Sequence, residues 1–276
     1  MLLQFPHLRY YASPSNRWVS FLRRLLLGTC TALLTACGTV HSARMWFPKT
    51  FGLDEVNSRL YVEPAMTAEQ RQEVQRRIDL SRIQVERFYG SITTTPYFVA
   101  CITKECDARF GSYGQPAAAY GELAIRLWAK DFSAPAVAVV AHELSHAELY
   151  HRVGGWWYAR KIPRWFDEGV AVLVGDESRH SEENWREIQR QGLPAPKLDE
   201  LMSFSDWGVA VNKYGETAGD VPSNLHVVYT TAGHTVREFL LCAGPTGIAA
   251  VLDAVHAGDS FSEAYARAEG AEKCTR

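Results

Sequence analysis

Residues 142–146 read His-Glu-Leu-Ser-His, and the run around them, Ala134 to Arg152, predicts one helix. A helix turns about 100° per residue, so His142 and His146, four positions apart, face the same way and can hold one metal ion. Glu143 lies beside the first histidine and points toward the same ion. The alternative is a surface helix that carries these residues by chance, because only three positions in the five are fixed.

A second motif follows this helix. Residues 165–171 read Trp-Phe-Asp-Glu-Gly-Val-Ala, and Pro163 precedes them where a new helix, Trp165 to Val174, would begin. Together the two motifs resemble the signature of the gluzincin metallopeptidases, which include thermolysin and the M1 aminopeptidases, and most of all their small peptidase-MA-like members. The resemblance implies one Zn²⁺ per chain, held by His142, His146 and Glu168. It also implies that Glu143 is the general base that accepts a proton from water during peptide hydrolysis.

Two family patterns are not met. Metzincins would have a glycine and a histidine where this chain has Leu149 and Arg152. The M1 enzymes carry a Gly-x-Met-Glu-Asn segment whose glutamate binds the free amine of the substrate, and this sequence lacks it. An endopeptidase is therefore favoured over an aminopeptidase.

A later helix, Leu225 to about Leu241, carries a further candidate. Tyr229 resembles the tyrosine of M1 enzymes that donates a hydrogen bond to the developing oxyanion, and it is otherwise a packed aromatic. His226 could share this role, and His234 is a lesser candidate. We expect His151, near the end of the first helix, to face solvent.

Ligand imidazoles need partners that orient them, and three acidic residues lie within sequence reach: Asp167, Asp176 and Glu148. The sequence does not decide which of them accepts a proton from a ligand histidine.

The predicted fold class is α+β: a small mixed sheet with an edge strand beside the histidine helix, followed by a mostly helical C-terminal part. A capping box at Thr67 opens a helix that ends at Gly90. Pro96 to Thr103 and Leu123 to Trp128 have the β-branched and aromatic character of strands. In gluzincins the strand just before the zinc helix is the sheet edge where an extended substrate pairs, so the resemblance implies that Ala117 to Trp128 borders the cleft in a zincin-like fold.

Three regions are expected along the chain. Residues 1–36 have arginines, a short apolar core and the string Leu-Thr-Ala before Cys37, which resembles a bacterial lipoprotein signal with Cys37 as the lipidated residue. The alternative is an ordinary secretion signal cleaved near Ala36. The stretch from Met1 to Asn16 is long for such a signal, and one explanation is a start codon placed too far upstream, with translation beginning nearer Val19; the sequence does not decide this.

Residues 37–63 form a tether and entry segment, and residues 64–276 form the metallopeptidase domain. We expect the aromatics of the entry segment (Trp46, Phe47, Phe51) to pack on the body. We expect the same of the connection after the histidine helix (Trp156, Trp157, Tyr158), whose alternative role is a wall of the cleft. Gly38 after the cysteine favours the outer membrane, facing the periplasm.

Four cysteines remain in the mature chain, an even number that suggests disulfides outside the cytosol. We favour Cys101–Cys106 and Cys242–Cys274 among the three possible pairings. A zinc cluster is the weaker interpretation, because no Cys-x-x-Cys pair occurs.

Composition limits the classes of function. The chain has 276 residues, 47% hydrophobic and 22% charged, enough for one good core, and its formal charge of −2 gives no electrostatic case for nucleic acid. The expected partners are a peptide or protein substrate in the cell envelope and the membrane itself. The alternative functions are an inactive zinc-binding lipoprotein and an envelope scaffold without metal.

Overall fold

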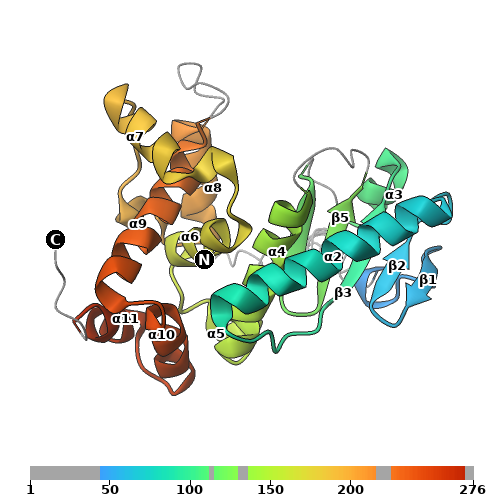
Figure 1. Ribbon diagram of the computed structural model, residues 1–276, viewed down its shortest axis with the longest axis horizontal. Helices are drawn as coiled ribbons and strands as arrows, with labels where there is room; N and C mark the ends of the chain where they lie inside the picture. Colours follow the sequence, from blue (N-terminus) through green and yellow to red (C-terminus); the bar gives the residue numbers. More distant parts are fainter. Residues whose placement is uncertain (1–43, 112–114, 130–135, 216–224, 271–276) are drawn as a thin grey trace, which may run out of the picture.

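The computed structural model describes residues 44–111, 115–129, 136–215 and 225–270. A small sheet covered by α2 forms one half of the molecule, helices form the other half, and α4 lies between them (Figure 1). This is the expected α+β architecture.

The sheet has five strands in the order β1-β2-β3-β5-β4. The inner pairs β2–β3 and β3–β5 are parallel, and the outer pairs β1–β2 and β4–β5 are antiparallel, so the sheet is mixed as predicted. The strands are β1 (Asp54–Asn57), β2 (Leu60–Val62), β3 (Tyr97–Cys101), β4 (Ala117–Tyr120) and β5 (Ala124–Trp128).

Two expectations about this sheet need correction. The strand directly before the histidine helix, β5, is an inner strand of the sheet. The edge strand is β4, a separate strand that the alanine-rich sequence 117–120 did not predict. The part of the expected entry segment that contains β1 and β2 belongs to the sheet, because β2 pairs with β3 from Leu60 to Val62.

The helices on the sheet side and in the middle are α2 (Ala68–Tyr89), α3 (Lys104–Arg109), α4 (Ala136–Arg152) and α5 (Trp156–Ala159). The helical half contains α6 (Arg164–Gly175), η1 (Ser178–His180), α7 (Glu182–Arg190), η2 (Leu198–Leu201), α8 (Phe204–Tyr214), α9 (Val227–Ala243), α10 (Gly247–His256) and α11 (Phe261–Glu269).

The ends of α2 follow the predicted chemistry. The Thr67 hydroxyl accepts a hydrogen bond from the Gln70 amide at 3.3 Å, and the Gln70 side chain accepts one from the Thr67 amide at 2.9 Å. Gly90 ends the helix with φ 77°, the left-handed conformation that glycine adopts at little cost. Local sequence alone is therefore enough to start and stop this helix.

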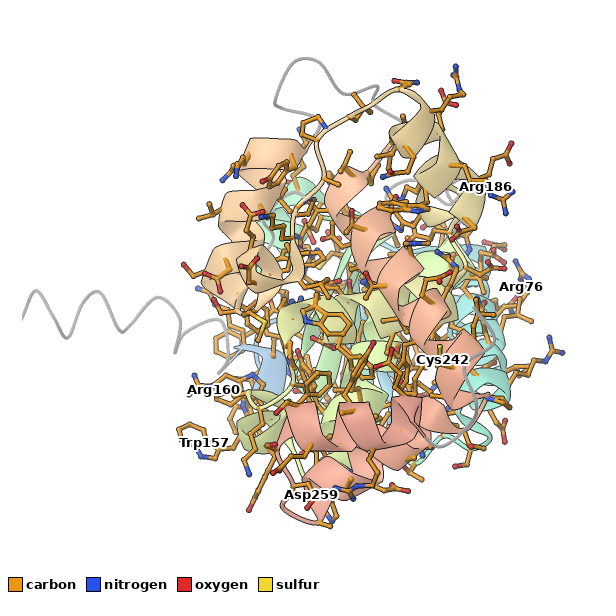
Figure 2. The ribbon with its side chains drawn as sticks, turned by 90° about the vertical axis from the view of Figure 1, so that its left-hand side faces the viewer. Arg76, Trp157, Arg160, Arg186, Cys242 and Asp259 are labelled. Atoms are coloured by element: carbon orange, nitrogen blue, oxygen red, sulfur yellow. A yellow bond between two sulfur atoms is a disulfide. The ribbon has the colours of Figure 1, made fainter. Side chains whose placement is uncertain are left out.

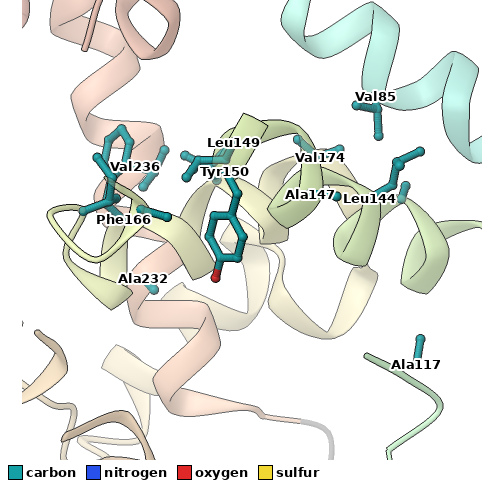
Figure 3. Close-up of a cluster of buried hydrophobic side chains, with 14 of the residues drawn as sticks. Val85, Ala117, Leu144, Ala147, Leu149, Tyr150, Phe166, Val174, Ala232 and Val236 are labelled. Carbon is teal, nitrogen blue, oxygen red and sulfur yellow. The ribbon is translucent and has the colours of Figure 1, made fainter. Parts of the chain in front are cut away.

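The core joins the two halves through α4. Figure 3 shows Val85 of α2 facing Leu144 and Ala147 of α4, while Phe166 of α6 packs against Val236 of α9. The α6–α9 contact is so close that a Cβ at Gly169 would lie 2.5 Å from the Ala232 carbonyl oxygen, which explains why glycine stands there.

Two of the predicted disulfide cysteines are joined in the described part of the chain. A disulfide joins Cys101 at the end of β3 to Cys106 in α3, which confirms that predicted pair. Cys242 is disulfide-bonded, but its expected partner Cys274 lies outside the described residues, as does the predicted lipid site Cys37.

Among the described residues, no single helix is long and apolar enough to cross a membrane. The pair α9 and α10 passes that test only when taken together, and a bend of 95° separates the two helices.

The aromatic residues near both ends of the sheet half were expected to pack on the body. Phe51 does pack against a small buried cluster, but Trp46, Phe47 and Trp157 are largely exposed to solvent. The expectation was wrong for these three, and also for Trp156 and Tyr158, each 45% exposed.

Candidate metal centre

His142, His146 and Glu168 meet in space, as the sequence predicts. Their ligand atoms all lie within 4.8 Å of one another, and all three residues are buried. Glu168 Oε2 lies 3.2 Å from His142 Nε2 and 3.6 Å from His146 Nε2. The two histidines occupy successive turns of α4, and α6 brings the glutamate in from a separate helix.

These separations fit a small tetrahedral ion. Ligand atoms bound to zinc at about 2.0–2.1 Å in a tetrahedron lie roughly 3.3–3.4 Å apart. Two imidazole nitrogens and one carboxylate oxygen are also a donor set that zinc accepts while keeping a position for water. The residues present therefore fit the metal that the sequence suggests.

Asp167 orients the second histidine. His146 Nδ1 lies 2.6 Å from Asp167 Oδ1, so its other nitrogen, Nε2, is the one that faces Glu168. The Tyr150 hydroxyl donates to Asp167 Oδ2 at 3.1 Å and fixes the carboxylate in turn. Of the three acidic candidates, Asp167 alone contacts a ligand imidazole through a hydrogen bond within the described residues.

Arg164 joins the same network from the first turn of α6. Its guanidinium pairs with both Asp167 and Glu168, and its Nη1 lies 3.2 Å from the Tyr150 hydroxyl. Burial raises the pKa of Glu168, but Arg164 and His146 outweigh that effect and hold it well below its usual range. Arg164 bonds Glu168 Oε1, which leaves Oε2 facing the histidines.

The charges also act on His146. Burial lowers its pKa, but the carboxylates of Asp167 and Glu168 more than offset burial and raise it to about 10. Burial alone would raise the pKa of the Asp167 carboxyl. The positive charges of His146 and Arg164 outweigh burial, so the pKa of Asp167 is lowered. His146, Arg164, Asp167 and Glu168 therefore form one buried cluster of four interacting side chains.

A different residue lies beside the first histidine. Glu177 Oε1 is 3.9 Å from His142 Nδ1, and the Glu177 carboxylate is buried and paired with Arg179. Asp176, the residue suggested by the sequence, ends α6 in a left-handed conformation and does not line the cavity at the metal centre. Glu148 faces away and accepts hydrogen bonds from the Thr93 and Thr94 amides.

Glu143 points toward the edge strand. Its Oε2 accepts a hydrogen bond from the Ala119 amide of β4 at 2.7 Å. Both Glu143 and Ala119 line the cavity that contains the three ligand residues. The expected border of the cleft is thus confirmed for β4, whereas no residue of β5 lines the cavity.

Tyr229 and two histidines form the opposite wall. Tyr229 stacks on His180, with ring centroids 5.2 Å apart, and lies edge-on to Trp207 at 5.0 Å. Burial and the charge of Glu168 raise the pKa of Tyr229, so its hydroxyl keeps its proton. His226 also lines the cavity, next to His180 at 5.1 Å.

His180 was not singled out from the sequence. Its ring is almost fully buried, and neither ring nitrogen has a hydrogen-bond partner among the described residues. Burial, with the charge of Arg179, lowers its pKa to about 2, so the ring is neutral. His180 lies beside Tyr229 because η1 packs on α9. No pattern in the neighbouring sequence predicts that contact.

The remaining histidine candidates lie elsewhere. His151 is exposed, as predicted, and pairs with Glu122 at 3.0 Å. His234 stacks on Trp185 with ring centroids 4.3 Å apart and does not line the cavity at the metal centre.

The cavity has a volume of about 420 Å³ and is bounded by two unlike walls. One wall is β4, whose small side chains leave its backbone accessible, and the other carries the ring of Tyr229 and the carboxylates of Glu168 and Glu177. Such an arrangement can hold a metal ion, a water molecule and an extended chain side by side.

No protein-family model matches this chain, and the comparisons with curated proteins and with solved structures also give no match.

Proposed function

We propose that this protein is a zinc-dependent endopeptidase of zincin-like fold, related to the gluzincins. The observation that carries the proposal is the convergence of His142, His146 and Glu168 in one buried group, in a cavity that Glu143 also lines. The zinc, when bound, would activate a water molecule and polarise the scissile carbonyl.

Each side chain then has a distinct task. Glu143 accepts a proton from the attacking water and later delivers it to the leaving amine, a role that requires a carboxylate in the cavity without binding the metal. Tyr229 keeps its proton and donates a hydrogen bond to the negative oxygen that develops in the transition state. Asp167 holds His146 in the required tautomer.

The edge strand offers the substrate a place to bind. Within the described residues, β4 pairs with β5 alone, so its other edge has backbone groups available to an extended peptide. The Ala119 amide bonds to Glu143 and so ties the position of the base to that of the strand. A peptide paired with β4 would run past the metal centre.

We place this enzyme in the bacterial envelope, anchored through a lipidated Cys37 to the outer membrane and facing the periplasm. The sequence before Cys37 supports the anchor, and the Cys101–Cys106 disulfide agrees with an oxidising compartment.

One experiment separates an enzyme from a zinc-binding protein. Purified wild type should contain about one zinc per chain, and Glu143→Gln should keep that zinc, because Glu143 is not a ligand. Hydrolysis of an unstructured protein should fall at least roughly 10²–10⁴-fold in this variant, the usual contribution of general base catalysis.

Glu238→Gln supplies the control, since it makes the same change on the exposed face of α9 and should leave zinc content and hydrolysis unaltered. If the zinc-loaded wild type cleaves a broad peptide library no faster than Glu143→Gln, the peptidase proposal is wrong and an inactive zinc-binding lipoprotein takes its place. Absence of zinc in the wild type would contradict both the peptidase proposal and the inactive zinc-binding alternative.

A further inference from the structure

Five aromatic side chains on the sheet half are unusually open to water. Trp157 is 70% exposed, Phe47 62% and Trp46 59%, and Trp156 and Tyr158 are 45% exposed each. We call these five residues the aromatic patch. Trp46 and Phe47 adjoin in sequence, as do Trp156 to Tyr158, and exposed apolar side chains grouped in this way often mark a surface that binds another molecule.

The patch joins two distant segments of the chain. Trp46 lies near the start of the described residues, and Trp156 is the first residue of α5. Both nonetheless line one cavity on the surface. The rings of Trp156 and Trp157 are 6.0 Å apart. Figure 2 shows Trp157 and Arg160 together at one edge of the molecule, with their side chains pointing outward.

Two cations accompany the rings. The Arg160 guanidinium lies 4.3 Å from the ring centroid of Trp156 and 4.8 Å from that of Trp157, and the Lys161 amine lies 5.0 Å from that of Tyr158. Within the described residues, neither cation forms an ion pair with a carboxylate. The nearby acid Glu122 lies 3.0 Å from His151, and Arg160 and Lys161 place two positive charges beside the aromatic rings.

We propose that the aromatic patch docks on an anionic lipid surface. Tryptophan and tyrosine favour the boundary between lipid and water, because each has an apolar body and a polar N–H or O–H. Arginine and lysine beside them add attraction to anionic headgroups. The partner that fits both features is a bilayer containing anionic lipid.

The length of the tether supports this partner. The proposal rests on the lipid anchor proposed above, and seven residue steps separate Cys37 from Arg44, the first described residue. A fully extended chain of this length reaches at most about 25 Å. Arg44 is two positions before Trp46, so a lipid on Cys37 would keep the aromatic patch close to the bilayer surface.

Docking would also orient the metal centre. A cavity of about 330 Å³ lies between the patch and the site, lined by Trp156 and Arg160 on the patch side. Arg164 and Phe204 line this cavity and also the cavity of the metal centre. The substrates reached from this position would be protein segments close to the membrane surface.

Quenching by brominated lipid tests the docking. The lipidated mature chain, which begins at Cys37, is bound to vesicles of phosphatidylglycerol and phosphatidylcholine with brominated acyl chains, which quench only tryptophans that reach the bilayer. Wild type should be quenched, and Trp157→Phe should remove roughly a third of the quenching, because it is one of three patch tryptophans. Trp185→Phe, a change in α7 outside the patch, is the matched control and should keep the full quenching.

Sedimentation of the vesicles separates failure of the anchor from failure of the patch. A chain that sediments with the vesicles while Trp157→Phe and Trp185→Phe are quenched equally would overturn the docking and leave the anchor in place. A chain that stays in solution would overturn both. In vesicles without phosphatidylglycerol the quenching should decrease, and equal quenching in both lipids would overturn the role of the anionic headgroups.

Discussion

The two walls of the metal-centre cavity are built by different means. The sheet wall consists of β4, where Ala117, Ala118 and Ala119 contribute small side chains and backbone groups. The helical wall consists of α6, η1 and α9, where Glu168 and Tyr229 belong to a network of buried charged and aromatic groups. Local hydrogen bonding shapes the first wall, whereas the second depends on buried charges that Arg164 pairs within α6 and that His146 of α4 also contacts.

This difference indicates where substitutions should most reduce stability and metal affinity. The β4 edge should tolerate change at its small side chains, because in the proposed function its backbone binds the peptide. A buried cluster of Arg164, Asp167 and Glu168 does not, because removal of any member leaves a charge without its partner in a medium of low polarity. The helical wall should therefore give the larger effects on stability and on metal affinity.

Arg164→Met should have the largest effect on stability. Removing one partner of a buried ion pair typically costs about 3–5 kcal/mol, since the remaining carboxylates stay buried without compensation. Urea unfolding of the metal-free protein measures the loss. The control Arg190→Met breaks an exposed pair with Glu187 in α7 and should change the unfolding midpoint little. If the Arg164→Met protein is as stable as wild type, the helical wall does not depend on its buried charges and the proposed difference between the two walls is wrong.

Gly169→Ala tests the packing behind the helical wall. The added Cβ would lie 2.5 Å from the Ala232 carbonyl oxygen and 2.6 Å from Val236 Cγ2, so α6 and α9 would have to separate. Overpacking of this kind costs about 1–3 kcal/mol in the free energy of unfolding. Gly208→Ala in α8 is the control, because its Cβ would meet nothing within 4 Å and alanine favours helix. Equal stability of the two variants would contradict the close α6–α9 contact.

Asp167→Asn should weaken zinc binding. The carboxylate accepts a hydrogen bond from His146 at 2.6 Å, and loss of such a partner typically lowers metal affinity about 10–100-fold. Competition with a chelator of known affinity measures this change. Asp176→Asn makes the same substitution at the end of the same helix, away from the cavity, and should keep the wild-type affinity. If both variants lose affinity equally, Asp167 has no special role in orienting His146.

Thr67→Ala should have the smallest effect on stability of these variants. The equivalent change in the helical half should have an effect of similar size. It removes the capping box of α2 and should cost about 1 kcal/mol, measured by urea unfolding, with zinc content unchanged. Ser203→Ala removes the equivalent box of α8 in the helical half and should cost a similar amount. A much larger loss in either variant would mean that the cap is coupled to the metal centre.

Much of the fold was predictable where the reason is local. The capping box at Thr67, the strand character of β3 and the spacing of His142 and His146 are properties of neighbouring residues, and each holds in the structure. The edge position of β4 was not predictable, because strand order depends on pairing between segments and alanine has no strong preference for strands.

By itself, the sequence determined which residues can act as metal ligands, since four-residue spacing places both histidines on one face of α4. Only the tertiary structure decided which side chains support them. Asp167 reaches His146 across 21 positions of sequence, and Glu177 rather than Asp176 lies beside His142, 3.9 Å from its Nδ1. The physical reason is that these contacts depend on how α6 packs against α4, and charges separated in sequence interact strongly only after packing removes the water between them.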